Sequence, residues 1–213
     1  MTPIRSLFLA SCRDVATALA DPLIHAAWDE PSVLEQQTVG SVAAHVGRGC
    51  WIALRYLDGD EPPGPVDFGS AADYFAKLIE AATTELHAGI RERGAEGAAA
   101  GAQSVQQQLL DELDVLEARL AGESEDRLVS VFGDNTMYLD DYLETRIVEQ
   151  VVHLDDLAQS IDREPFTVPA EAETLVIACG ADIGRRRFGS TAMIRTLFRN
   201  GPDDGGGLPL PVL

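Results

Sequence analysis

Cysteine is scarce in this sequence, and long apolar runs are missing. The three cysteines are scattered, odd in number and never arranged as CxxC, so they indicate neither a disulfide framework nor a thiolate metal site. Such usage fits a reducing cytoplasm. The apolar stretch over residues 7–10 is too short for a secretory signal, and no stretch approaches the length of a membrane span. We therefore expect a cytoplasmic protein without a membrane partner.

Positive charge is scarce as well. Sixteen Lys and Arg residues stand against thirty-five Asp and Glu residues, which gives a formal net charge of −19 at pH 7. Nucleic acids and anionic lipid surfaces are bound through clustered cations, and no basic stripe is present. We therefore expect no nucleic-acid partner. Motifs for a Gly-rich phosphate loop and for a nucleophile elbow are also missing.

Alternating strand patterns are nearly absent, whereas apolar residues recur at helical spacing along most of the chain. Hydrophobic residues make up 46% of the chain, which is enough for a sizeable core. The pattern predicts an all-α fold built around four long helices. Only residues 127–135 have an extended pattern. We expect helices over about residues 4–20, 38–56, 71–93, 105–120, 137–160, 169–186 and 191–199.

Breaks in this pattern divide the chain into three parts. Residues 1–165 are expected to form the helical bundle, and residues 166–200 a C-terminal helical extension that follows Pro165. Residues 201–213 are rich in glycine and proline, which predicts a disordered tail. Within the bundle, residues 94–104 are low in complexity and predict a flexible joint or a loose helix.

Two polar residues, Glu149 and His153, lie among the apolar positions of the helix expected over residues 137–160. Residues four apart share one face of a helix, so both side chains point inward. A buried carboxylate is costly unless it is paired or bound to a cation. His45 also lies among apolar neighbours, in the helix expected over residues 38–56. Together the three residues offer an N, O, N set that suits Zn²⁺ or a similar divalent ion.

The same residues admit a second interpretation. A glutamate and a histidine one turn apart can simply hydrogen-bond to each other, and a core histidine is often satisfied by a backbone carbonyl. The pattern alone leaves both interpretations open.

Three stretches of the chain resemble a known family. Residues 28–51, WDEPSVLEQQTVGSVAAHVGRGCW, resemble its Trp and Pro-Ser positions and the TVGxLxxHV entry into its second helix. Residues 131–161, VFGDNTMYLDDYLETRIVEQVVHLDDLAQSI, resemble its Gly turn, DYLxxR and ExxxHxxDLA patterns. Residues 184–199 are similar to closing segments of relatives. The family is the mycothiol-dependent maleylpyruvate isomerase N-terminal domain family of the DinB-like superfamily, and the resemblance covers about residues 1–165.

The resemblance implies a DinB-like four-helix bundle with additional C-terminal helices, and a divalent metal, above all zinc, held by His45, Glu149 and His153. It implies mycothiol as the thiol cosubstrate, and hence an enzyme that is a mycothiol-dependent S-transferase or is similar to maleylpyruvate isomerase. A metal-bound thiolate would attack a small electrophile, the expected small-molecule partner. Two alternatives stay open, which are a metal-dependent hydrolase and a non-catalytic DinB-like module for binding or dimerisation.

Two further residues are candidates for the same site. Arg146 precedes Glu149 by one turn, so it is a candidate for binding the cosubstrate or another anion, or for an ion pair with a nearby carboxylate. Asp156 follows His153 by three residues and either orients that histidine or remains a solvated charge. No side chain stands out as a catalytic base. A homodimer is compatible with the sequence.

Overall fold

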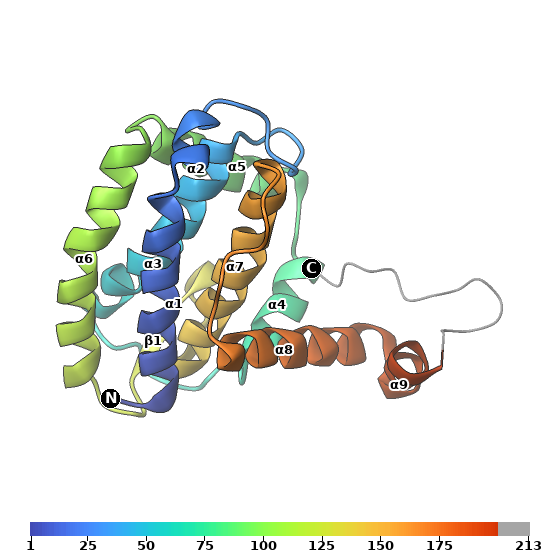
Figure 1. Cartoon of the computed structure of the whole chain (residues 1–213). Coiled ribbons are helices and arrows are strands. Elements are labelled where there is room, and N and C mark those ends of the chain that lie inside the picture. Colours follow the sequence, from blue (N-terminus) through green and yellow to red (C-terminus); the bar gives the residue numbers. More distant parts are fainter. Residues whose placement is uncertain (200–213) are drawn as a thin grey trace.

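Four long helices lie side by side in the computed structural model, which describes residues 1–199 (Figure 1). They are α1 (Pro3–Leu19), α3 (Val39–Asp58), α6 (Ala102–Gly122) and α7 (Leu139–Ser160). The helices α1 and α3 both pack against α6 and α7, and the apolar stripes of all four form the core. The all-α prediction is confirmed. The tail predicted over residues 201–213 lies outside the described residues.

Close packing around Gly40 fixes the beginning of α3. A Cβ atom at Gly40 would lie 2.6 Å from the indole of Trp28, so only glycine leaves room for this ring. The indole Nε1 of Trp28 donates a hydrogen bond to the carbonyl of Ala98 at 3.0 Å. Trp28 belongs to the connector between α1 and α3, which also contains the short helix α2 (Pro22–Ala26). The connector is thereby held between two helices of the bundle.

The prediction of a single helix over residues 71–93 is wrong, because the structure has two helices there. They are α4 (Ala71–Glu80) and α5 (Thr84–Ala98). Thr83 has an extended backbone, and its side chain accepts a hydrogen bond from the backbone N–H of Leu86, which begins a new helix. The joint expected over residues 94–104 is mostly helical, and the chain turns at Gly101, where φ is +82°. The break between α4 and α5 lets α5 pack across α3.

A small hairpin precedes α7. Strand β1 (Leu128–Ser130) pairs antiparallel with β2 (Thr136–Tyr138), and the 3-10 turn η1 (Phe132–Asp134) joins them. The sequence predicted the extended stretch over residues 127–135, but it missed β2. The first residues of the helix expected from residue 137 belong to this strand. The long helix therefore starts two residues later than predicted.

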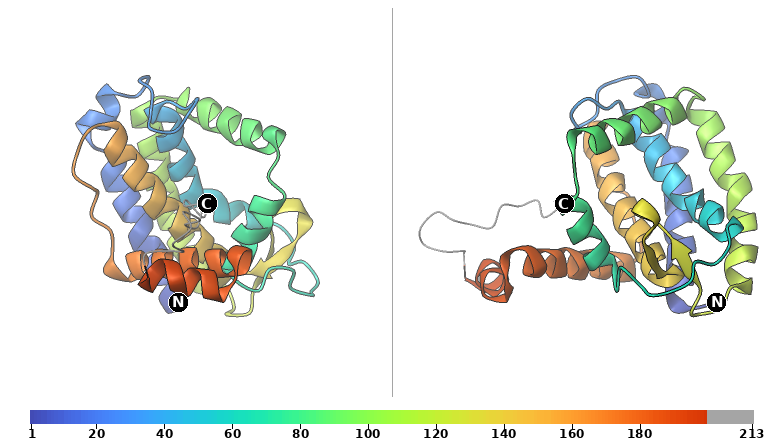
Figure 2. Two further views of the ribbon diagram at one scale, coloured as in Figure 1. Left: turned by 90° about the vertical axis from the view of Figure 1, so that its right-hand side faces the viewer. Right: turned by 180° about the vertical axis from the view of Figure 1, so that it is seen from behind.

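Two helices follow the bundle. Helix α8 (Ala170–Phe188) packs against α4 and α7, and α9 (Ser190–Phe198) packs against α8. Figure 2 shows α8 running along one end of the bundle and carrying α9 beyond it. Among the described residues, no helix combines the length and apolar character needed to cross a bilayer.

A buried arginine joins three segments at one end of the bundle. The side chain of Arg5 is 1% exposed, and its Nε lies 2.7 Å from Oδ1 of Asp140 at the start of α7. Its other nitrogens donate to the carbonyls of Leu120, Glu123 and Ser124 at the end of α6. These carbonyls lie where a helix ends and leaves acceptors unpaired. The guanidinium therefore satisfies the end of α6 while it holds α1 and α7 together.

We predict that Arg5→Met lowers the free energy of unfolding by about 3–5 kcal/mol, because it removes the cation beside Asp140 and leaves several carbonyls without their donor. The matched control is Arg13→Met, in the same helix. Arg13 forms an exposed ion pair with Glu117 at 2.6 Å, and exposed pairs contribute about 1 kcal/mol or less. Urea denaturation of both variants measures the difference. Equal losses in the two variants would contradict the role assigned to Arg5.

Candidate metal centre

The three predicted ligands lie on two helices that pack against each other in the bundle. His45 is in the first half of α3, and Glu149 and His153 are one turn apart near the middle of α7. The helices α3 and α7 contact each other along the core. The structure thus brings together residues that are more than 100 positions apart in the sequence.

The ligand atoms of these residues converge. One ligand atom from each of His45, Glu149 and His153 can be chosen so that all three lie within 4.8 Å of one another. Oε2 of Glu149 lies 3.0 Å from Nε2 of His45 and 3.6 Å from Nε2 of His153. The two imidazole rings meet edge to face, with their centroids 5.0 Å apart. Both Nε2 atoms therefore face the same carboxylate oxygen.

A second carboxylate orients His153. Oδ2 of Asp156 accepts a hydrogen bond from Nδ1 of His153 at 2.8 Å. This contact fixes the ring and leaves Nε2 directed at Glu149, which is the usual arrangement of a ligating histidine and its outer partner. Of the two interpretations of Asp156 that the sequence left open, the structure favours the orienting one.

Burial and hydrogen bonding oppose each other in setting the charges here. Burial alone would raise the pKa of Glu149, but its hydrogen bonds to His153 and His45, with the nearby charge of Arg146, hold this pKa well below its usual range. Burial alone would lower the pKa of His153, but hydrogen bonds to Asp156 and Glu149 outweigh it and raise the pKa to about 9. Glu149 is therefore a carboxylate anion, and positive charge around it is favoured.

A cavity of about 380 Å³ opens beside His45 and Glu149. Helices α3, α4, α5 and α7 and the hairpin turn all contribute to its wall. The polar part of the wall carries three arginines and three tyrosines: Arg48, Arg93, Arg146, Tyr56, Tyr74 and Tyr142. The apolar part is Ile52, Leu78, Leu86, Ile90 and Phe132. The site is thus a pocket with cationic and apolar walls.

The arginines give this cavity a local excess of positive charge. Burial and the neighbouring charge of Arg93 both lower the pKa of Arg48. Arg146 is half-buried, its Nε donates to Oγ1 of Thr145 at 3.0 Å, and its guanidinium lies 5.1 Å from the ring centroid of Tyr142. Among the described residues, no carboxylate lies within ion-pair distance of Arg48 or Arg93. Two guanidiniums without such a partner favour an anionic ligand.

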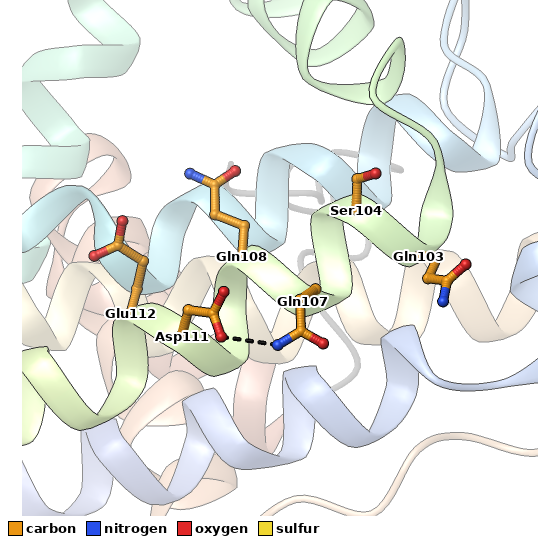
Figure 3. Close-up of a pocket in the computed structure, with 6 residues that line it drawn as sticks. All are labelled: Gln103, Ser104, Gln107, Gln108, Asp111 and Glu112. Carbon is orange, nitrogen blue, oxygen red and sulfur yellow. Dashed lines mark hydrogen bonds between the residues drawn. The ribbon is translucent and has the colours of Figure 1, made fainter.

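A larger hollow of about 550 Å³ lies elsewhere, on the outer face of α6 (Figure 3). Its six lining residues all come from this one helix, and Gln107 donates a hydrogen bond to Asp111 at 2.8 Å. The hollow has no opposing wall from another element and no histidine or arginine. This hollow therefore offers fewer groups for chemistry than the cavity beside the three ligands.

The residues present fit a divalent cation. They supply two imidazole nitrogens and one ionised carboxylate on rigid helices, and one imidazole is held by an outer carboxylate. Such N and O donor sets are typical of Zn²⁺ and related ions. The sequence indicated Arg146 but missed Arg48 and Arg93. Arg48 follows His45 by three residues on α3, which was an available signal, whereas the position of Arg93 depends on the unforeseen break before α5.

A family model described as the mycothiol maleylpyruvate isomerase N-terminal domain matches residues 8–158. The match covers more than two thirds of the chain and includes all three predicted ligands, but it ends before α8. No curated protein and no solved structure matches the chain. The resemblance noted for residues 184–199 therefore lies beyond the matched part.

We predict that the protein binds one divalent ion per chain and that His153→Ala abolishes this binding while the bundle remains folded. Glu149→Gln keeps the shape of the side chain but removes its charge, so it should also weaken binding strongly. The control is His87→Ala, at an exposed position in α5. Elemental analysis after dialysis against Zn²⁺ measures occupancy, and circular dichroism reports folding. Unchanged occupancy in His153→Ala would show that the ligand set is wrong.

Asp156→Asn should weaken Zn²⁺ affinity by about 10–100-fold, because the outer carboxylate orients His153 and strengthens it as a ligand. Its neighbour Asp155 supplies a matched control, since it is exposed and accepts a hydrogen bond from Gln159. Competition with a chelating indicator measures both affinities. The role of Asp156 would be refuted by equal affinities in Asp156→Asn and Asp155→Asn.

Proposed function

The chain belongs to the mycothiol maleylpyruvate isomerase N-terminal domain family, and we propose that it is a metal-dependent enzyme in which mycothiol attacks a small anionic electrophile. The observation that carries the proposal is the cavity beside the three converging ligands, because a cluster of arginines lines it in a strongly acidic chain. Membership of the family supports mycothiol as the thiol, and the arginines of the cavity support a negatively charged second substrate.

The ligand residues have defined parts in this proposal. His45, Glu149 and His153 would hold the cation, for which Zn²⁺ is the best match to the donor set. When bound, such an ion lowers the pKa of a thiol that reaches it, so that more of the thiol is reactive at neutral pH. Three protein ligands leave coordination open to an exogenous group, which distinguishes this arrangement from a closed structural site.

The cavity wall would select and position the electrophile. Arg48 and Arg93 have guanidiniums that can bind carboxylate oxygens in a planar, bidentate manner. Arg146 lies deeper, next to Glu149, and its contact with Tyr142 restrains it. The apolar side chains of the wall, which come partly from the same helices as Arg48 and Arg93, would contact the uncharged part of the electrophile.

Addition of the thiol to the electrophile can then lead to two products. Attack of the mycothiol sulfur forms an S–C bond and moves an electron pair onto the electrophile. If that bond persists and a proton is taken up, the product is an S-conjugate. If the sulfur leaves again after rotation about the attacked bond, the product is the geometric isomer and the thiol is regenerated. The same residues serve both outcomes, since both begin with one addition.

We predict that the Zn²⁺-loaded protein accelerates the reaction of mycothiol with an unsaturated dicarboxylate, and that Arg48→Gln and Arg93→Gln each lower kcat/KM by about 10–100-fold. The neutral dimethyl ester of the same electrophile should be affected little, because it lacks the charges that the arginines bind. Arg91→Gln is the control, since Arg91 lies in α5 outside the cavity wall. Loss of free thiol measures the rates.

The alternatives give different results in the same experiment. Hydrolysis of esters or amides without any thiol would indicate that the protein is a hydrolase and not a transferase or isomerase. If no substrate is turned over while metal binding is intact, the result would indicate a non-catalytic binding module. Equal losses with the dicarboxylate and its ester would refute the assignment of Arg48 and Arg93 to an anionic group.

A further inference from the structure

Another hollow adjoins the cavity beside the three ligands and lies between α3 and α6. Its volume is about 580 Å³, and its wall consists of residues between positions 48 and 58 of α3 and between positions 108 and 119 of α6. Arg48 and Ile52 belong both to this wall and to the wall of the cavity. The two hollows therefore meet at these two residues, and we call the second one the α3–α6 groove.

The α3–α6 groove presents charged groups of both signs. Three arginines, two carboxylates and one amide line it: Arg48, Arg55, Arg119, Asp58, Glu112 and Gln108. The cavity also has three arginines, but its one carboxylate is Glu149, a predicted metal ligand. Carboxylates disfavour an anion and guanidiniums disfavour a cation, whereas a hydroxyl group can donate to the former and accept from the latter. The groove therefore suits an uncharged ligand that carries several hydroxyl groups.

Most of these groups are available to such a ligand. In the part of the chain that the structure describes, Arg55, Asp58 and Glu112 form no ion pair, although they line the same groove. The side-chain amide of Gln108 likewise forms no hydrogen bond with a described residue. A ligand could therefore bind to these side chains without breaking contacts within the protein.

An aromatic ring completes the wall. Trp51 is half-buried, and its six-membered ring lies over Gly47, where an added Cβ atom would be 3.3 Å from Cζ3. Its indole N–H has no hydrogen-bond partner among residues 1–199. An indole offers an apolar face together with one polar donor, so it can contact both the C–H and the hydroxyl groups of a sugar ring.

The proposed thiol contains a part with this chemistry. Mycothiol carries its thiol on an acylated cysteine, which is joined to a glucosamine–inositol unit with many hydroxyl groups. Residues 48–52 follow His45 by three to seven positions, which is about 5–10 Å along the helix axis. One extended residue spans about 3.5 Å, so the sugar of a thiol whose sulfur lies beside His45 would be at the start of the groove.

We propose that the α3–α6 groove binds the glucosamine–inositol part of mycothiol, while the sulfur lies beside His45 and Glu149. Arg48 borders both hollows and therefore stands between the thiol and the electrophile that the cavity binds. The groove favours mycothiol over thiols that lack rings with hydroxyl groups. The inference rests on the proposed function for the identity of the thiol, and it adds the site that holds the far end of that thiol.

The first test measures binding without any reaction. The probe is a sulfur-free mycothiol in which alanine replaces the cysteine, titrated by calorimetry into the Zn²⁺-loaded full chain. Wild type should bind it, and the double variant Gln108→Ala/Glu112→Ala should bind about 10-fold more weakly, because two hydrogen-bonding side chains are lost. Circular dichroism checks that this variant remains folded.

The chain offers a matched control for this double variant. Gln107 and Asp111 have the same spacing on α6, but they hydrogen-bond to each other at 2.8 Å and lie outside the groove (Figure 3). Gln107→Ala/Asp111→Ala should bind the probe as wild type does. Equal affinities in the two double variants, or a wild type that does not bind the probe, would overturn the proposal.

The second test measures the choice between thiols. With the same electrophile, the ratio of kcat/KM for mycothiol to kcat/KM for N-acetylcysteine should fall about 10-fold in Gln108→Ala/Glu112→Ala, with the change in KM. An unchanged ratio would overturn the proposal. Binding of the sulfur-free probe without any consumption of thiol would refute the proposed function and support the groove. Consumption of mycothiol without binding of the probe would support the proposed function and refute the groove.

Discussion

A half-buried carboxylate between two helices of the bundle is the constraint from which the site follows. Glu149 carries a negative charge, its side chain is only 24% exposed, and an uncompensated charge there would be costly. The structure compensates it from several sides, with His45 from α3, His153 one turn later in α7, and Arg146 one turn earlier. The register of α3 against α7 is therefore tied to this one side chain. Two of these groups, His45 and His153, also form with Glu149 the set of side chains that suits a cation.

The charge of Glu149 accounts for Arg146, whereas Arg48 and Arg93 reach the adjoining cavity through the packing of α3 and α5, in a protein with net charge −19. The cavity is formed by segments that bring guanidiniums and tyrosines together. The break between α4 and α5 is essential to this, because it directs α5 across α3 and carries Arg93 to the cavity wall. A local region of positive potential inside an acidic molecule is what the proposed anionic electrophile would need.

The sequence was sufficient to predict the bundle helices, because each buries a continuous apolar stripe whose period is visible in the residues. Polar residues on core-facing stripes also suggested that His45, Glu149 and His153 share one site, but it was the family resemblance that favoured a metal site over a simple hydrogen-bonded pair. The break before Thr83 was not predictable in the same way. No glycine or proline marks it, and one capping side chain there outweighs the tendency of the residues to continue a helix. Strand β2 was missed because three residues are too few to show alternation. The convergence of Arg48 with Arg93 depends on tertiary packing and has no local pattern.

Arg5 has a consequence for the order in which the chain acquires its structure. Its partners lie 115 to 135 residues further along the sequence, so the contact that seats the first helix joins the two most distant parts of the bundle. Closing so long a loop costs entropy that local contacts do not repay. On a ribosome, the first helix to be synthesised must therefore wait until the start of α7 has emerged. Until then the part of α1 that packs against α7 in the folded protein stays uncovered.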